Sequence, residues 1–242
     1  MKIANTILNN LDEKIQQAGL PDREELTTYE GVIQKSSLML FILVAAAAAT
    51  WYSGYAANPL TLQVSAIMGL VIAFIISFKP VTAPFLAPLY AILEGMALAS
   101  LSFFCEINYP GIATNAVLIT LSIFAVSLLL YAKQIVTVDN DFKKMVMTAT
   151  FAVVIVYLMN FVFSFLGIQI PMLHESGIIG IAFSLMVVGI ATFNLFLDFQ
   201  LVAEAVEEQA PKYFEWYCAF GLTVTLVWLY IEILKLLRKL RK

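Results

Sequence analysis

The most informative part of the chain is SGIIGIAFSLMVVGIATFNLFLDFQ (residues 176–200), in which Asp198 is the only charged side chain. The stretch is long enough to cross a bilayer, because the hydrocarbon core requires about 20 predominantly apolar residues in a helix. Six more stretches of this kind lie at 36–57, 60–79, 82–105, 111–132, 145–168 and 213–237. The bilayer core holds no water to satisfy backbone groups, so each stretch should be a helix. The sequence predicts an all-α integral membrane protein with seven transmembrane helices.

The overall composition points to the same class and excludes several others. Apolar residues make up 61% of the chain and charged residues 13%, against about 45–50% and about 25% in soluble domains. Such a chain is too apolar to be disordered, and a net charge of -3 offers no basic surface to a nucleic acid. Two cysteines and one histidine provide neither a disulfide framework nor a zinc cluster. Since no catalytic motif or phosphate loop occurs either, we expect neither an enzyme nor a cofactor.

The first part of the chain differs from the rest. Within residues 1–35, apolar side chains recur every four positions among charged ones, at Ile3, Ile7, Leu11 and Ile15. This spacing places them on one face of a helix. We predict a cytoplasmic amphipathic N-terminal segment over residues 1–35, lying on the membrane surface or on the bundle. The seven-helix transmembrane domain would then occupy residues 36–242.

The charges of the loops predict the orientation. Nine lysines and arginines lie in the N-terminal region and in the loops after the second, fourth and sixth stretches, and none lies in the other three loops. Because cytoplasmic loops carry the excess of basic residues, the N-terminus should be cytoplasmic. The C-terminal tail conflicts with this rule, since seven crossings would place five bases outside: Lys235, Arg238, Lys239, Arg241 and Lys242. We favour seven crossings because 213–237 is as long as its neighbours, while a re-entrant last stretch stays open.

Three acidic residues lie well inside the predicted spans: Glu94, Asp198 and Glu232. A charged group near the bilayer centre costs about 2.5–3.5 kcal/mol on insertion scales. No lysine or arginine lies at comparable depth, although Lys235 could reach one of the acids from a span end. We therefore expect the acids to face water, share protons or bind a cation. A neutral carboxyl group hydrogen-bonded between helices is the structural alternative.

Helix geometry suggests how these groups are arranged. Glu94 falls near the middle of its span and Asp198 near the cytoplasmic end of its own, while Glu232 lies roughly 30 Å along the last helix. The acids should therefore form a ladder across the membrane. Asn194 precedes Asp198 by one turn, so both side chains should share a face and line one path.

Three prolines mark the start of the third span. Pro80, Pro84 and Pro88 are spaced four residues apart, and Pro84 and Pro88 lack the N–H groups that would bond the carbonyls one turn earlier. The spacing predicts a kinked or unwound helix start, whose freed carbonyls could line a cation path as the broken helices of transporters do.

Six motifs follow one another along nearly the whole chain from residue 28: TYEGVIQK (28–35), LYAILEG (89–95), YPGI (109–112), NLFLDF (194–199), EWYCAFGLT (215–223) and WLYIEIL (228–234). Their order and spacing resemble the Bax inhibitor-1/YccA-like (transmembrane BAX inhibitor motif) family, in its bacterial branch. The resemblance implies a seven-helix fold whose last helix is surrounded by the other six. It also implies a location in a bacterial cytoplasmic (inner) membrane.

The same resemblance implies a pH-sensitive calcium leak, gated by two acids on the last two helices. Asp198 matches the first of these acids. The second departs from the family pattern, because an apolar residue near Trp228 stands where the family has its aspartate. Glu232, one turn further, is the nearest acid, and Glu94 is a candidate to complete the site.

The leading prediction is a pH-sensitive calcium (cation) leak channel in the lipid bilayer, with Asp198 as the gate. Glu94, Glu232 and Asn194 would line the route, and the three acids would contact the permeant Ca²⁺, which prefers several oxygen ligands. Protonation would remove the charges and so regulate the leak with pH.

Two other functions stay open. A non-transporting regulator could bind other membrane proteins, such as a quality-control protease, through the acidic N-terminal helix or an acidic loop cluster: Glu204, Glu207 and Glu208. Deleting residues 1–27 should abolish such a function but spare a leak. A proton-coupled carrier would use the same acids and show saturable solute uptake driven by a pH gradient.

Overall fold

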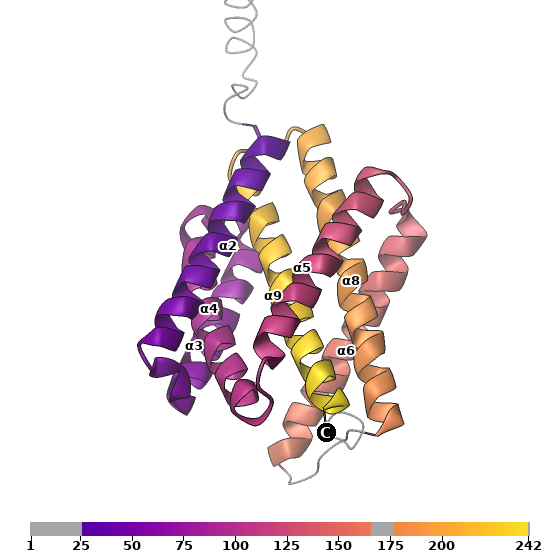
Figure 1. The fold of residues 1–242 in the computed structure, drawn as a ribbon. Coiled ribbons are helices and arrows are strands. Elements are labelled where there is room, and N and C mark those ends of the chain that lie inside the picture. Colours follow the sequence, from indigo (N-terminus) through magenta and orange to yellow (C-terminus); the bar gives the residue numbers. More distant parts are fainter. Residues whose placement is uncertain (1–25, 166–176, 242) are drawn as a thin grey trace, which may run out of the picture.

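The computed structural model describes residues 26–165 and 177–241, and the amphipathic stripe predicted near the N-terminus lies outside this part. The described chain forms seven helices that are long and apolar enough to cross a membrane (Figure 1), so the predicted fold class is confirmed. These helices are α2 (Tyr29–Tyr52), α3 (Pro59–Phe78), α4 (Ala83–Asn108), α5 (Ile112–Ala132), α6 (Asn140–Phe165), α8 (Ile178–Glu207) and α9 (Phe214–Leu240). Two short 3-10 helices, Tyr55–Ala57 and Pro80–Thr82, lie in turns.

The first helix begins earlier than its apolar stretch. α2 starts at Tyr29, whereas the sequence placed the start of the span at residue 36. The Thr28 hydroxyl accepts a 3.0 Å hydrogen bond from the Gly31 N–H, which satisfies one of the free donors of the first turn. Glu30 and Lys35 therefore belong to the helix. Hydropathy marks where apolar side chains begin, but capping decides where the backbone becomes helical.

The helix predicted to be broken by prolines is continuous. The chain turns in the 3-10 segment that contains Pro80, and α4 then runs unbroken from Ala83 to Asn108. Pro84 lies in the first turn of α4, where its missing N–H would have had no intrahelical partner. Only Pro88 lies inside the helix. The unwound alternative is wrong, because the first two prolines coincide with the real boundary. A kink at Pro88 stays a prediction.

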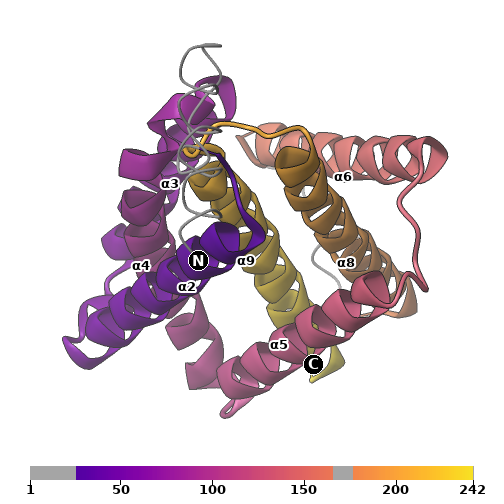
Figure 2. The same cartoon turned by 90° about the horizontal axis from the view of Figure 1, so that it is seen from above.

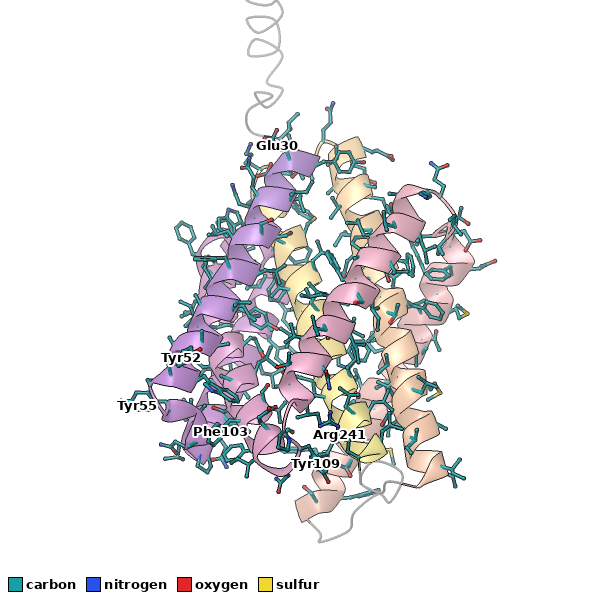
Figure 3. All side chains as sticks on the ribbon, in the orientation of Figure 1. Glu30, Tyr52, Tyr55, Phe103, Tyr109 and Arg241 are labelled. Atoms are coloured by element: carbon teal, nitrogen blue, oxygen red, sulfur yellow. The ribbon has the colours of Figure 1, made fainter. Side chains whose placement is uncertain are left out.

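The seven helices alternate in direction, so the ends of the described chain lie on opposite sides of the bundle (Figure 1). Figure 3 shows Glu30 at one end and Arg241, beside Tyr109, at the other. α9 is an uninterrupted helix of 27 residues that does not turn back, so the re-entrant arrangement is excluded. The basic end of α9 therefore lies on the side opposite the start of α2.

α9 occupies the centre of the bundle (Figure 2). It contacts α2, α4, α5 and α8, and α3 packs against α4. Ser102 of α4 and Tyr230 of α9 share a 2.6 Å hydrogen bond in the interior. α6 reaches α9 through side chains, since the Tyr157 hydroxyl donates to Glu232. The central helix α9 is the most buried of the seven, whereas α2 and α6 bury the smallest share of their apolar windows.

Candidate functional site

The three intramembrane acids lie in three separate environments. Glu94 faces α3, Asp198 faces α9, and Glu232 is held by groups of α6 and α9. Within residues 26–165 and 177–241, no group of three or more His, Cys, Asp or Glu side chains could hold a metal ion. The structure thus does not join Asp198, Glu94 and Glu232 into one calcium site.

Asp198 lies at the contact between α8 and the central helix α9. A Cβ atom at Gly221 would be 3.5 Å from Asp198 Oδ1, so the carboxyl group faces the bare backbone of α9. The Thr225 side chain, one turn further along α9, interacts with the same carboxyl group. Asp198 Oδ2 is buried and has no hydrogen-bond partner in the described chain. An ionised carboxylate in this position would need water, a cation or a further donor.

Asn194 does not join Asp198 in a shared site. Its side-chain amide donates to the Thr150 hydroxyl of α6 over 2.8 Å and to the Ile190 carbonyl over 2.9 Å. One helical turn is therefore enough to direct the two side chains to different neighbours, α6 for Asn194 and α9 for Asp198. These contacts support the assignment of Asn194 as a structural link between α6 and α8.

Glu94 lies at the interface of α3 and α4, away from Asp198. A Cβ atom at Gly69 would lie 2.8 Å from Glu94 Oε1, so the carboxyl group fills the space that glycine leaves on α3. Tyr90, one turn earlier on α4, interacts with the same carboxyl group. Glu94 is half-buried, and its surroundings are those of an acid packed between two neighbouring helices.

Glu232 has a cationic partner, contrary to the expectation of three unpaired acids. Its side chain is 1% exposed and lies 2.9 Å from the Lys235 ammonium. The Tyr157 hydroxyl donates to the carboxylate over 2.9 Å and the Trp228 indole N–H over 3.2 Å. Lys235 lies three residues further along α9, so the two side chains share a face. Three donors, one of them the Lys235 cation, satisfy Glu232 without a metal or a water-filled route.

The sequence analysis missed a fourth buried acid, Glu215. Its side chain is in the first turn of α9 and is fully buried. The Thr28 backbone N–H and hydroxyl donate to Glu215 Oε1 over 3.2 and 3.0 Å, and the Lys212 ammonium lies 3.6 Å from the same atom. A Cβ atom at Gly31 would lie only 1.9 Å from this oxygen. Glycine at position 31 therefore makes room for the carboxylate at the start of α2.

Thr27 adds two hydrogen bonds between the start of α2 and the turn before α9. The Thr27 N–H donates to the Ala210 carbonyl and the Thr27 hydroxyl to the Pro211 carbonyl, each over 2.8 Å. We call these groups the N-terminal clamp: Leu26, Thr27, Thr28, Ala210, Pro211 and Glu215. The sequence predicted that both helix starts lie on the same side of the membrane, but nothing in a single chain indicates that they touch.

Two acids at the central helix keep a buried oxygen without a hydrogen-bond partner in the described chain: Asp198, which faces α9, and Glu215, in its first turn. The other oxygen of Glu215 accepts hydrogen bonds from Thr28 and lies near the Lys212 ammonium. No curated protein and no solved structure matches the chain. The Bax inhibitor 1 like family, however, matches residues 5–242. This match covers nearly all of the sequence, including every described helix. The chain therefore belongs to the Bax inhibitor 1 like family.

Proposed function

We propose that the protein is a pH-sensitive cation leak, with calcium as the permeant ion and Asp198 as the gate. The observation that carries the proposal is the buried Asp198 oxygen without a hydrogen-bond partner at the contact between α8 and α9. A neutral carboxyl group can remain buried in this contact at a lower cost than an ionised one. An ionised one cannot remain without water or a cation.

This difference supplies a gating mechanism. With Asp198 protonated, α8 and α9 stay closely packed across Gly221 and the route is closed. Loss of the proton as the pH rises would favour separation of the two helices, entry of water, and attraction of a cation to the carboxylate. The leak should therefore increase with pH and shut down in acid.

The proposal treats Ca²⁺ as a passing ion. Calcium binds tightly where six to eight oxygen ligands surround it, and the described residues contain no group of three or more His, Cys, Asp or Glu side chains placed to hold a metal ion. Weak binding at a single carboxylate suits conduction, because a permeant ion must also leave its site. Glu94 and Glu232 are not assigned to the gate, since each already has other partners.

The test measures calcium entry into proteoliposomes over a range of pH, with wild-type protein and Asp198→Asn. Asparagine mimics the neutral acid, so calcium entry at alkaline pH should fall about tenfold, the ratio expected for loss of one charged contact. The pH dependence should also flatten. Glu207→Gln is a matched control, because it removes one negative charge from an exposed position on the same helix. Calcium entry and pH response equal to wild type in Asp198→Asn would exclude Asp198 as the gate.

The alternative function, a regulator that docks on other membrane proteins, is favoured by the exposure of Glu207 and Glu208 at the C-terminal end of α8. Glu204 is less available, because it is bonded to Lys143 and Gln200. Deletion of residues 1–25 leaves the N-terminal clamp in place and separates the two functions. A leak should conduct as before, whereas a regulator that docks through this segment should lose its partner, for which we propose a membrane protease.

The proposed setting is a bacterial cytoplasmic membrane with the N-terminus in the cytoplasm. The nine basic residues on the N-terminal side support this orientation. In this setting the gate lies nine residues before the cytoplasmic end of α8, at a depth of about 14 Å.

A further inference from the structure

A cavity of about 180 Å³ lies between the start of α2 and the start of α9, at the end of the bundle where Figure 3 shows Glu30. Four charged side chains line it: Glu30, Lys35, Lys212 and Glu215. Their formal charges cancel, so the lining favours neither a simple anion nor a metal cation. It suits a small molecule that carries one group of each sign. A cavity of about 150 Å³ holds benzene, so this one has room for a slightly larger molecule.

Glu215 contributes an acceptor that lacks a donor. Its side chain is fully buried, and Thr28 donates two hydrogen bonds to Oε1. Oε2 is buried as well and has no hydrogen-bond partner in the described chain. The Lys212 ammonium lies 3.6 Å from Oε1, which is beyond hydrogen-bond distance. A buried carboxylate oxygen without a donor is costly, so a ligand with N–H groups would supply what the described chain does not.

The two lysines of the cavity are able to turn toward an anionic group. Lys35 Nζ lies 5.6 Å from the centre of the Trp216 ring, and the Lys212 side chain is 51% exposed. Lys212 can move away from Glu215 without breaking a hydrogen bond, because the two are joined by charge alone at 3.6 Å. A lysine ammonium is a compact charge with three rotatable donors, and it is a common ligand of phosphate groups. The cavity thus offers donors to a phosphate group as well as acceptors to an ammonium.

The depth of the cavity matches that of lipid headgroups. The apolar stretch of the first span begins directly after Lys35, and Thr28, at the other edge of the cavity, lies about 10 Å further out along α2. The headgroup layer extends roughly 5–7 Å beyond the hydrocarbon on each side of a bilayer. Trp216, beside Lys35, is a residue type that is enriched at this level. A headgroup can therefore reach the cavity from the surrounding leaflet.

We propose that this cavity binds a phosphoethanolamine group, with its ammonium directed to Glu215 and Glu30 and its phosphate to Lys35 and Lys212. Free phosphoethanolamine and the headgroup of phosphatidylethanolamine share this chemistry. Phosphocholine carries the same charges, but its trimethylated nitrogen has no hydrogen to donate to Glu215 Oε2, so the site should discriminate against it. The proposal concerns α2 and the first turn of α9 and holds whether or not Asp198 gates a leak.

The experiment uses the full-length protein and has two arms. In detergent, the melting temperature is followed while phosphoethanolamine or phosphocholine is titrated at constant ionic strength. In nanodiscs, it is compared between phosphatidylcholine alone and phosphatidylcholine mixed with phosphatidylethanolamine. The cavity variants are Glu30→Gln and Lys35→Gln. Their matched controls are Glu207→Gln and Lys133→Gln, which remove the same charges from exposed positions at the same end of the bundle.

Wild type should be stabilised by phosphoethanolamine, by phosphatidylethanolamine, or by both, and the arm that responds identifies the source. Each cavity variant should weaken the apparent affinity about tenfold, as expected for loss of a charged hydrogen bond, while both controls should match wild type. Absence of stabilisation in both arms would overturn the proposal. So would an equal response to the choline compounds, wild-type affinity in either cavity variant, or an equal loss in the controls.

Discussion

Glu232 and Asp198 are both carboxyl groups within the membrane-spanning helices, but the protein surrounds them differently. Glu232 accepts hydrogen bonds from Tyr157, Trp228 and Lys235. Asp198 faces a glycine and has an oxygen without a hydrogen-bond partner in the described chain. Glu232 is held in an ion pair, whereas one oxygen of Asp198 has no donor. We therefore expect substitution of Glu232 to lower the stability of the protein, and substitution of Asp198 to change the pH response of calcium entry.

Glu232→Gln should lower stability and leave calcium entry unchanged. Glutamine keeps the shape of the side chain but loses the ion pair with Lys235. The free energy of unfolding should fall by about 1–2 kcal/mol. This is less than for a fully buried pair, because the Lys235 side chain is 39% exposed. Denaturation in detergent measures the loss, and the double variant with Lys235→Gln should lose less than the sum of the two single variants. A stable Glu232→Gln protein that no longer conducts calcium would contradict this assignment.

At this scale the sequence revealed which residues are unusual but not what they contact. The depth of Glu94, Asp198 and Glu232 could be predicted, because hydropathy gives the register of each residue along its helix. Their partners could not, because Tyr157 and Gly221 come from other helices. Lys235 was the exception, since its three-residue spacing from Glu232 is visible in the sequence.

The close contact between α2 and α4 depends on Gly95. A Cβ atom there would lie 2.3 Å from the Leu43 carbonyl oxygen and 2.9 Å from the Ala46 Cβ. The nearest group belongs to the backbone of α2 and cannot rotate away. The helices can therefore approach this closely only while position 95 has no side chain.

Gly95→Ala should consequently destabilise the protein by about 1–3 kcal/mol, the usual cost of overpacking. Gly189→Ala is the matched control, because a Cβ atom at this helical position meets nothing within 4 Å, and alanine is the better helix former. The melting temperature of purified Gly95→Ala should thus fall, whereas that of Gly189→Ala should rise or stay unchanged. A Gly95→Ala protein as stable as wild type would show that α2 can shift to accommodate the methyl group.

The helices themselves could be predicted from hydropathy because lipid imposes a minimum apolar length on each. Their ends could not, because they depend on individual hydrogen bonds. Thr28 starts α2, and the Asp139 side chain accepts a 2.7 Å hydrogen bond from the Phe142 N–H at the start of α6. Both helices consequently begin before the apolar residues do.

At the scale of the whole molecule, the seven spans of the described chain place Leu26 and Arg241 on opposite sides of the bundle. Tags at the N- and C-termini should therefore have opposite protease accessibility in sealed vesicles of known orientation. The C-terminal tag should lie on the membrane face opposite the cytoplasm. Detergent should expose both tags and serves as the control. Equal protection of both tags would contradict the seven-span arrangement, which the uninterrupted α9 supports.

The N-terminal clamp joins the start of α2 to the turn between α8 and α9 through Thr27, Thr28 and Glu215. Residues 1–25 continue directly from it along the chain. A force applied to the chain ahead of Leu26 would load these hydrogen bonds and pass through Glu215 to the first turn of α9. The clamp thus ties the start of the described chain to the helix that is buried most deeply in the bundle.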